Sequence, residues 1–188
     1  MGSISHRSRT FLLLLAVGAC LSCGGGGGGG TIPSTCIAFQ SSAAPTPSTA
    51  VARQATGSVC GTVIVEIVLT GVTDVFAVDF QVSFDASVAS YDGHSFFGSH
   101  FISDGAVPQV LESVQPGLVS LSMTRLNPST GIDFVGTQPV VRLIFSMPAG
   151  SGAASGGLSF TNTSVLGSET PPQPKPGIQW FGGTLQIG

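Results

Sequence analysis

The strongest constraint on the fold is a period of two between Val75 and Phe84. Large apolar residues stand at every second position, namely Phe76, Val78, Phe80, Val82 and Phe84, and the positions between them hold Val75, Ala77, Asp79, Gln81 and Ser83. Successive side chains of a β-strand point to opposite faces, so a period of two indicates a strand with one buried face. In the preceding run, from Thr62 to Thr70, the same period places Val63, Val65, Ile67 and Leu69 on one face. The sequence therefore predicts paired β-sheets.

Turn residues separate these runs from several later ones. Further strands are expected at Val107 to Val114, Leu118 to Arg125, Val140 to Met147, Leu158 to Asn162 and Thr184 to Ile187. The breaks carry Gly, Pro, Asn and Asp, which favour turns for backbone reasons. No window has a sustained helical period, and short strands at this spacing predict an all-β sandwich or jelly roll.

The N-terminus has the pattern of an export signal. Basic residues at His6, Arg7 and Arg9 precede an uncharged apolar run from Thr10 to Ser22. This run is shorter than the roughly 20 residues that a membrane span needs, and it is typical of a secretory signal peptide. The segment Val17-Gly18-Ala19-Cys20 resembles the lipobox of bacterial lipoproteins. It implies removal of residues 1–19, acylation of Cys20, and a protein anchored at the outer membrane or cell surface.

Cys23 is an alternative acylation site, because it directly precedes the glycine run and would leave Cys36 and Cys60 as an even pair. Cys20 is preferred, since acylation of Cys23 would put Cys20 where Leu, Val or Ile is usual. A third reading leaves both cysteines unmodified after an ordinary secretory signal. Cys36 and Cys60 could form a disulfide in an oxidising compartment, but spacing alone does not decide whether they are bonded.

Residues 20–57 are rich in Gly, Ser, Thr, Pro and Ala. Such composition behaves as a flexible linker, so we expect a tether there and a single folded domain over residues 58–188. One alternative is that the segment around Cys36, Ile37 and Phe39 packs onto the domain. About 130 residues are enough to bury one core without metal or dense disulfides.

The charge balance argues against nucleic acid as a partner. After residue 19 the chain has four basic and nine acidic residues, so its formal net charge is −5. Phosphate binding needs clustered Lys and Arg, and only 8% of all residues are charged. The polar surface must come from Ser, Thr, Gln and Gly.

The order of these features resembles a cohesin domain, the module that docks dockerin-bearing proteins. The resemblance covers residues 58–188 and rests on three segments: TVIVEIVLTGVTDVFAVDFQVSFDASV from Thr62, GTQPVVRLIFSMPAG from Gly136, and FGGTLQIG from Phe181. It implies a jelly-roll sandwich of about nine strands that works by protein docking, with a dockerin-bearing partner and no transferable contact residues. A carbohydrate-binding module of the same architecture, with polysaccharide as ligand, is the alternative, and Trp180 is its candidate sugar contact.

No active site is expected. Asp92, His94, His100 and Asp104 cluster in one segment, but their spacing matches no zinc or EF-hand pattern, so we interpret them as part of a solvated loop. The serines have no catalytic motif around them, and the acidic residues are scattered. The sequence predicts a protein that is not an enzyme, without catalytic residues, metal or cofactor.

Alternation also predicts a docking face. If Val119, Leu121 and Met123 face the core, the outward residues are Ser120, Ser122 and Thr124, with Arg125 at the end of the strand. An inward set of Val141, Leu143 and Phe145 leaves Val140, Arg142 and Ile144 outward. The cohesin resemblance implies that both strands contribute to one flat sheet face. We therefore expect Ile144 to be an apolar anchor and Ile144→Asp to weaken partner binding more than tenfold, about 1.4 kcal/mol.

Overall fold

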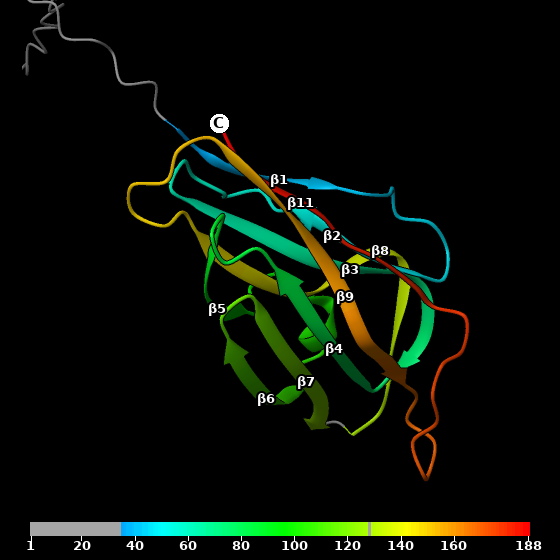
Figure 1. The fold of residues 1–188 in the computed structure, drawn as a ribbon. Coiled ribbons are helices and arrows are strands. Elements are labelled where there is room, and N and C mark those ends of the chain that lie inside the picture. The colour runs from blue at the N-terminus through cyan, green and yellow to red at the C-terminus, as the bar shows by residue number, and fades with distance from the viewer. Residues whose placement is uncertain (1–34, 128) are drawn as a thin grey trace, which may run out of the picture. The chain divides into compact units, whose positions relative to one another are not determined.

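The structure is a computed structural model that describes residues 35–127 and 129–188. These residues form a two-layer β-sandwich, which confirms the predicted all-β class (Figure 1). The elements are β1 (Ile37–Ser41), β2 (Thr49–Gln54), β3 (Thr62–Val75), β4 (Ala77–Phe84), β5 (Ser90–Ser95), the 3-10 helix η1 (His100–Ile102), β6 (Val107–Gln115), β7 (Leu118–Asn127), β8 (Ile132–Ser146), β9 (Ala154–Leu166), β10 (Gln179–Phe181) and β11 (Gly183–Ile187).

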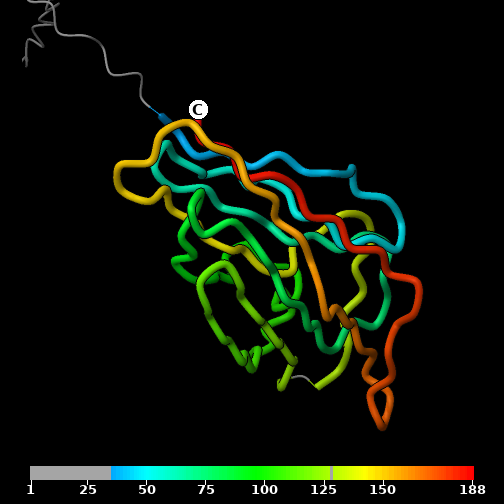
Figure 2. The backbone as a smooth tube through the Cα atoms, in the orientation of Figure 1, coloured from blue at the N-terminus to red at the C-terminus, as the bar shows by residue number. Residues whose placement is uncertain are grey.

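The strands divide into two sheets. Sheet A has the order β1-β11-β9-β4-β7-β6, and sheet B has the order β10-β2-β3-β8-β5. Neighbouring strands are antiparallel except β10 and β2, which are parallel. Figure 2 follows the backbone and shows the last strand running between β1 and β9, so the two ends of the folded region meet in sheet A.

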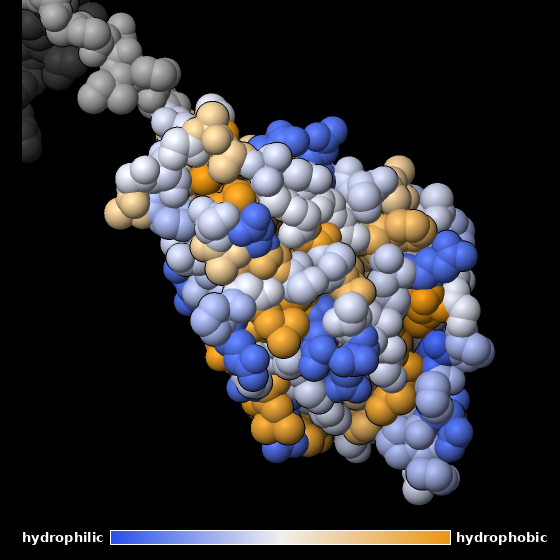
Figure 3. Space-filling model, in the orientation of Figure 1, coloured by the Kyte–Doolittle hydropathy of each residue, from blue (hydrophilic) through white to orange (hydrophobic). Residues whose placement is uncertain are grey.

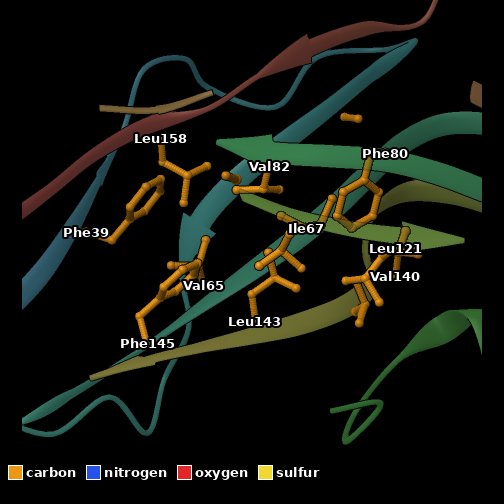
Figure 4. Packing of buried hydrophobic residues seen from close by; sticks show 14 of the residues in the cluster. Phe39, Val65, Ile67, Phe80, Val82, Leu121, Val140, Leu143, Phe145 and Leu158 are labelled. Atoms are coloured by element: carbon orange, nitrogen blue, oxygen red, sulfur yellow. The ribbon is translucent and has the colours of Figure 1, made fainter. Parts of the chain in front are cut away.

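The core fills the space between the sheets, where the inward residues of both layers meet. Phe80 and Val82 of β4 and Leu121 of β7 face Ile67 of β3 and Leu143 of β8 across the sandwich (Figure 4). All five are at most 2% exposed. Burying one such side chain contributes about 1.5–3 kcal/mol, so the alternating strands supply most of the hydrophobic stabilisation.

The predicted tether is wrong for part of its length, because residues 37–41 and 49–54 form β1 and β2. Ile37 and Phe39 insert into the core beside β11, and Ala50 to Ala52 are fully buried against β3. The small residues of this segment made its composition resemble that of a linker. In the structure, Ala50 and Ala52 are instead buried where β2 pairs with β3. Residues 20–34 of the predicted tether lie outside the described residues.

A disulfide joins the start of β1 to the turn before β3. The bond links Cys36 and Cys60, whose Cα atoms are 4.3 Å apart. The backbone is also tied here, because the amide of Ile37 donates a hydrogen bond to the carbonyl of Cys60. The strand β1 is thus attached to sheet A by its pairing with β11, and the disulfide attaches its start to the turn that precedes β3 of sheet B.

Sheet B contains a bulge that changes which residues of β8 face outward. Val141 lies opposite Ile67, but Pro139 lies opposite Val68, so Val140 is an extra residue in β8. Val140 and Val141 are both buried as a result. The prediction that Val140 points outward is therefore wrong, because alternation was counted without this extra residue.

Candidate functional site

The residues predicted to form one docking face lie on opposite sides of the sandwich. Ser120, Ser122 and Thr124 belong to β7 of sheet A, whereas Arg142 and Ile144 belong to β8 of sheet B. The strand β7 pairs with β4 and β6, and β8 pairs with β3 and β5. The two groups therefore belong to two separate surfaces.

Arg125 is not on a surface, and its prediction as an outward residue is wrong. It shares the inward parity of Met123 and its side chain is fully buried. Its guanidinium donates hydrogen bonds to the carbonyls of Thr130 and Phe101 and to the carboxylate of Asp104. Burial raises the pKa of Asp104, but the hydrogen bonds from Arg125 and from the amide of Ala106, together with the charge of Arg125, hold that pKa below its usual range. Arg125 therefore fastens the segment before β6 to one end of the sandwich.

The outer face of sheet A is a surface of short polar side chains. It comprises the outward residues of four strands: Gln109, Leu111 and Ser113 of β6, Ser120, Ser122 and Thr124 of β7, Asp79, Gln81 and Ser83 of β4, and Ser159, Thr161 and Asn162 of β9. Ser122 lies between Asp79 and Leu111, and Ser120 lies between Gln81 and Ser113. Figure 3 shows this side of the molecule, where polar residues predominate over β4, β7 and β9 with apolar ones between them.

A shallow hollow of about 310 Å³ opens on this face, lined by residues of β4, β6, β7 and β9. Asn162 stands at its rim because β9 bulges there. Thr161 lies opposite Gln81 and Ser164 lies opposite Asp79, so β9 holds one additional residue. Asn162 adopts a positive φ of 47°, a conformation that Asn tolerates well, and donates from Nδ2 to Oε1 of Gln81 at 2.7 Å. The sequence predicted a strand that ends at Asn162, and the bulge could not be foreseen.

The electrostatics of this face depend on one carboxylate. Asp79 is partly exposed and forms no ion pair with any described residue. The basic residues of the described chain, Arg53, Arg125, Arg142 and Lys175, are all paired elsewhere. The outer face of sheet A therefore has hydroxyl and amide groups, an exposed Leu111 and one free negative charge.

The outer face of sheet B is organised around a buried carboxylate. Glu66 of β3 is 5% exposed and lies opposite Arg53 of β2 and Arg142 of β8. Arg53 donates to Oε2 at 3.1 and 3.2 Å, and Arg142 donates to Oε1 at 2.5 and 2.9 Å. The exposed ring of Phe97 lies 5.3 Å from the Arg142 guanidinium, and Ile144 lies opposite Ile64.

Asp92, His94, His100 and Asp104, which cluster in the sequence between Tyr91 and Gly105, each contact different side chains and not one another. His94 meets the carboxylate of Glu112, His100 contacts Gln138 and Ser103, Asp92 accepts from Ser146, and Asp104 pairs with Arg125. Among residues 35–127 and 129–188, no group of three or more His, Cys, Asp or Glu side chains is placed to hold a metal ion. The interpretation of this segment as a solvated loop is wrong in part, because it contains most of β5 and all of η1, and Phe101 is fully buried.

Trp180, the candidate sugar contact, packs between the sheets. Its ring lies 5.7 Å from that of Phe80 and 5.2 Å from that of Phe160, and it is only partly exposed.

Cys20 and Cys23, the candidate acylation sites, lie outside the described residues. No helix in the described part of the chain is long and apolar enough to span a membrane.

Solved structures with the same architecture are cohesins. The seventh type I cohesin of ScaB from Pseudobacteroides cellulosolvens matches with a TM-score of 0.54 at 15% identity, covering 72% of this chain and 88% of that one. The third cohesin of ScaC from Acetivibrio cellulolyticus, solved with the ScaB dockerin, matches with a TM-score of 0.53 at 14% identity, covering 68% and 89%. The domain has a cohesin-like fold.

A third cohesin-like match is the sixth cohesin of scaffoldin B from Acetivibrio cellulolyticus, solved with the Cel5 dockerin. Its TM-score is 0.50 at 15% identity, and the match covers 66% of this chain and 89% of that one. No protein-family model matches this sequence, and no curated protein matches it. The likeness of the cohesin-like domain to these structures is therefore a likeness of fold.

Proposed function

We propose that this protein is a non-catalytic docking module that binds a dockerin-like protein partner through the outer face of sheet A. The observation that carries the proposal is this face itself, a broad strand surface with one free carboxylate and a shallow hollow beside the exposed Leu111. Two of the cohesins with the same fold were solved bound to dockerins, which supports a partner of that kind.

The chemistry of the face suits protein docking. Hydroxyl and amide groups lose little on leaving water if a partner supplies hydrogen bonds, whereas unpaired charges lose much more. Leu111 can provide an apolar contact at the centre, and Asp79 can pair with a basic residue of the partner. The outer face of sheet B offers less, because its charged side chains are already paired with one another within the domain.

The carbohydrate-binding alternative has weaker support. Sugar binding by stacking needs an exposed aromatic ring, and Trp180 instead packs against Phe80 and Phe160. The described residues of the outer face of sheet A include no aromatic side chain. Polysaccharide therefore remains a second ligand class without a structural feature that favours it.

Titration calorimetry with a dockerin-bearing protein from the same genome tests the proposal. Ser120→Arg places a long charged side chain on the docking face and should weaken binding at least tenfold, about 1.4 kcal/mol. Ile144→Asp, on the opposite sheet, is the matched control and should leave affinity unchanged. If only Ile144→Asp weakens binding, docking uses sheet B. If the wild-type protein binds no dockerin, the proposed function is wrong.

The second part of the proposal is that the domain is exported and held at a membrane by lipid on Cys20. Its support is the basic N-terminus, the short apolar run and the lipobox-like Val17 to Cys20. Mass spectrometry of the mature protein should find an acylated N-terminal cysteine at position 20. Acylation at Cys23 would correct the site, and an unmodified N-terminus elsewhere would contradict anchoring.

A further inference from the structure

The four edge strands of the sandwich differ in how they are protected. A strand edge has unpaired backbone groups that can pair with another chain, and proteins usually shorten, bulge or cover it. The edge β10 has three residues, and β5 has six with a register shift at Gly93. The edge β1 has five residues, is tethered by the disulfide, and has its Phe39 amide bonded to the Gln54 side chain at 2.7 Å.

The edge β6 has none of this protection over most of its length. It has nine residues, and its register with β7 is regular from Pro108 to Gln115. No strand of the described chain pairs with its other side. Seven large apolar side chains are exposed in the described residues, and four belong to the β6–β7 hairpin: Val107, Leu111, Val114 and Leu126. Figure 3 shows apolar surface along the lower-left margin, where β6 and β7 lie.

The charge on β6 does not protect it either. Glu112 is the only ionisable residue of the strand. Its carboxylate accepts a hydrogen bond from the Tyr91 hydroxyl and lies 3.1 Å from Nδ1 of His94. Both partners belong to β5, so Glu112 is held toward the sheet B side of the molecule. A strand approaching in the plane of sheet A therefore meets unpaired backbone and uncharged side chains.

We propose that β6 is the interface between two copies of this chain, which pair antiparallel about a two-fold axis at Leu111. In this register Leu111 faces Leu111 of the second copy, Gln109 faces Ser113, and Glu112 faces Val110. No charged residue lies directly opposite a like charge. One contact closes both unprotected edges, as an isologous interface does, and the self-complementary register favours a second copy over an unrelated strand.

The pairing has a consequence for docking. A two-fold axis perpendicular to the sheet keeps the outer faces of both copies on the same side of one continuous sheet. Two docking faces would then lie next to each other. A partner with two binding modules would bind the dimer more tightly, because the first contact raises the effective concentration of the second module. Leu111 belongs to both surfaces, but dimerisation is measured without a partner, so failure of the dimer and failure of docking can be told apart.

Sedimentation equilibrium of the full chain with Cys20→Ser and Cys23→Ser, which removes both candidate acylation sites, tests the dimer. We expect a concentration-dependent shift from monomer to dimer mass. Leu111→Lys sets two like charges opposite each other and should raise the dimer dissociation constant at least tenfold. The matched control is Val135→Lys, which changes an equally exposed valine of β8 and should leave the dissociation constant unchanged.

Cross-linking then tests the register. In the same background, Leu111→Cys should form an intermolecular disulfide on oxidation, and Gln115→Cys should not, because residue 115 faces Val107. A monomer at every concentration would overturn the proposal. So would a dimer that Leu111→Lys leaves intact, or one that cross-links through residue 115 and not residue 111.

Discussion

The two outer faces of the sandwich use their polar residues in opposite ways. On sheet B, Arg53 and Arg142 converge on Glu66, so one buried carboxylate satisfies two cations within the domain. On sheet A, Asp79 forms no ion pair with any residue of the described chain, and its neighbours on the outer face are mostly uncharged hydroxyl and amide side chains. Polar groups that are satisfied internally contribute to stability, whereas groups left free on a flat face are available to a partner. This difference supports the proposal that docking uses the outer face of sheet A, whereas the ion pairs of sheet B stabilise the fold.

The largest expected effect is on stability, at sheet B. Glu66→Gln removes the charge that holds Arg53 and Arg142 and should lower the free energy of unfolding by about 3 kcal/mol, since breaking a buried pair leaves the remaining charges uncompensated. Urea denaturation measures this. The matched change on sheet A, Asp79→Asn, should alter stability by less than about 0.5 kcal/mol. Equal effects of the two variants would contradict the division of roles.

The next effect is on binding, at sheet A. Leu111→Ala removes the exposed apolar side chain beside the hollow and should weaken docking by about 1.4 kcal/mol, a tenfold change. Phe97→Ala removes an exposed apolar ring beside Arg142 of sheet B and should leave docking unchanged. Surface plasmon resonance with the dockerin partner compares them. A loss of binding only in Phe97→Ala would reverse the comparison.

A smaller effect concerns salt. Because the docking face has a single free carboxylate, raising the salt concentration should weaken binding by less than about threefold, as expected for one exposed charge pair. Asp79→Asn should abolish this residual salt dependence. Calorimetric titrations at low and high salt measure it, and a steep salt dependence that survives Asp79→Asn would point to charged residues outside this face.

The smallest effect concerns acid. Arg125 holds the pKa of Asp104 below its unfolded value of 3.8, so this carboxylate contributes stability above the unfolded pKa and loses it as the pH falls through the folded pKa. Asp104→Asn should therefore make stability less dependent on pH below about 4. Acid titration followed by circular dichroism tests this, and an unchanged pH dependence of stability in Asp104→Asn would contradict it.

Alternation predicted the sandwich because strand periodicity is local. The inward residues of β4 and β7, such as Phe80 and Leu121, follow from sequence position alone. The segments β1 and β2 were missed, since residues such as Ala50 and Ala52 have too little apolar character to separate a strand from a linker. The bulges at Val140 and Asn162 were also missed, because each depends on the partner strand that the extra residue lies beside.

By itself the sequence determined the class of fold, the inward face of most strands and the paired cysteines as candidates for a bond. Only the tertiary structure decided which strands share a sheet, and therefore that Ser120 and Ile144 lie on opposite surfaces. It also decided that Arg125 is buried at the sandwich end and that Glu66 meets two arginines. The physical reason is range: side-chain direction is set by neighbours in the chain, whereas strand order and ion pairing join residues far apart in it.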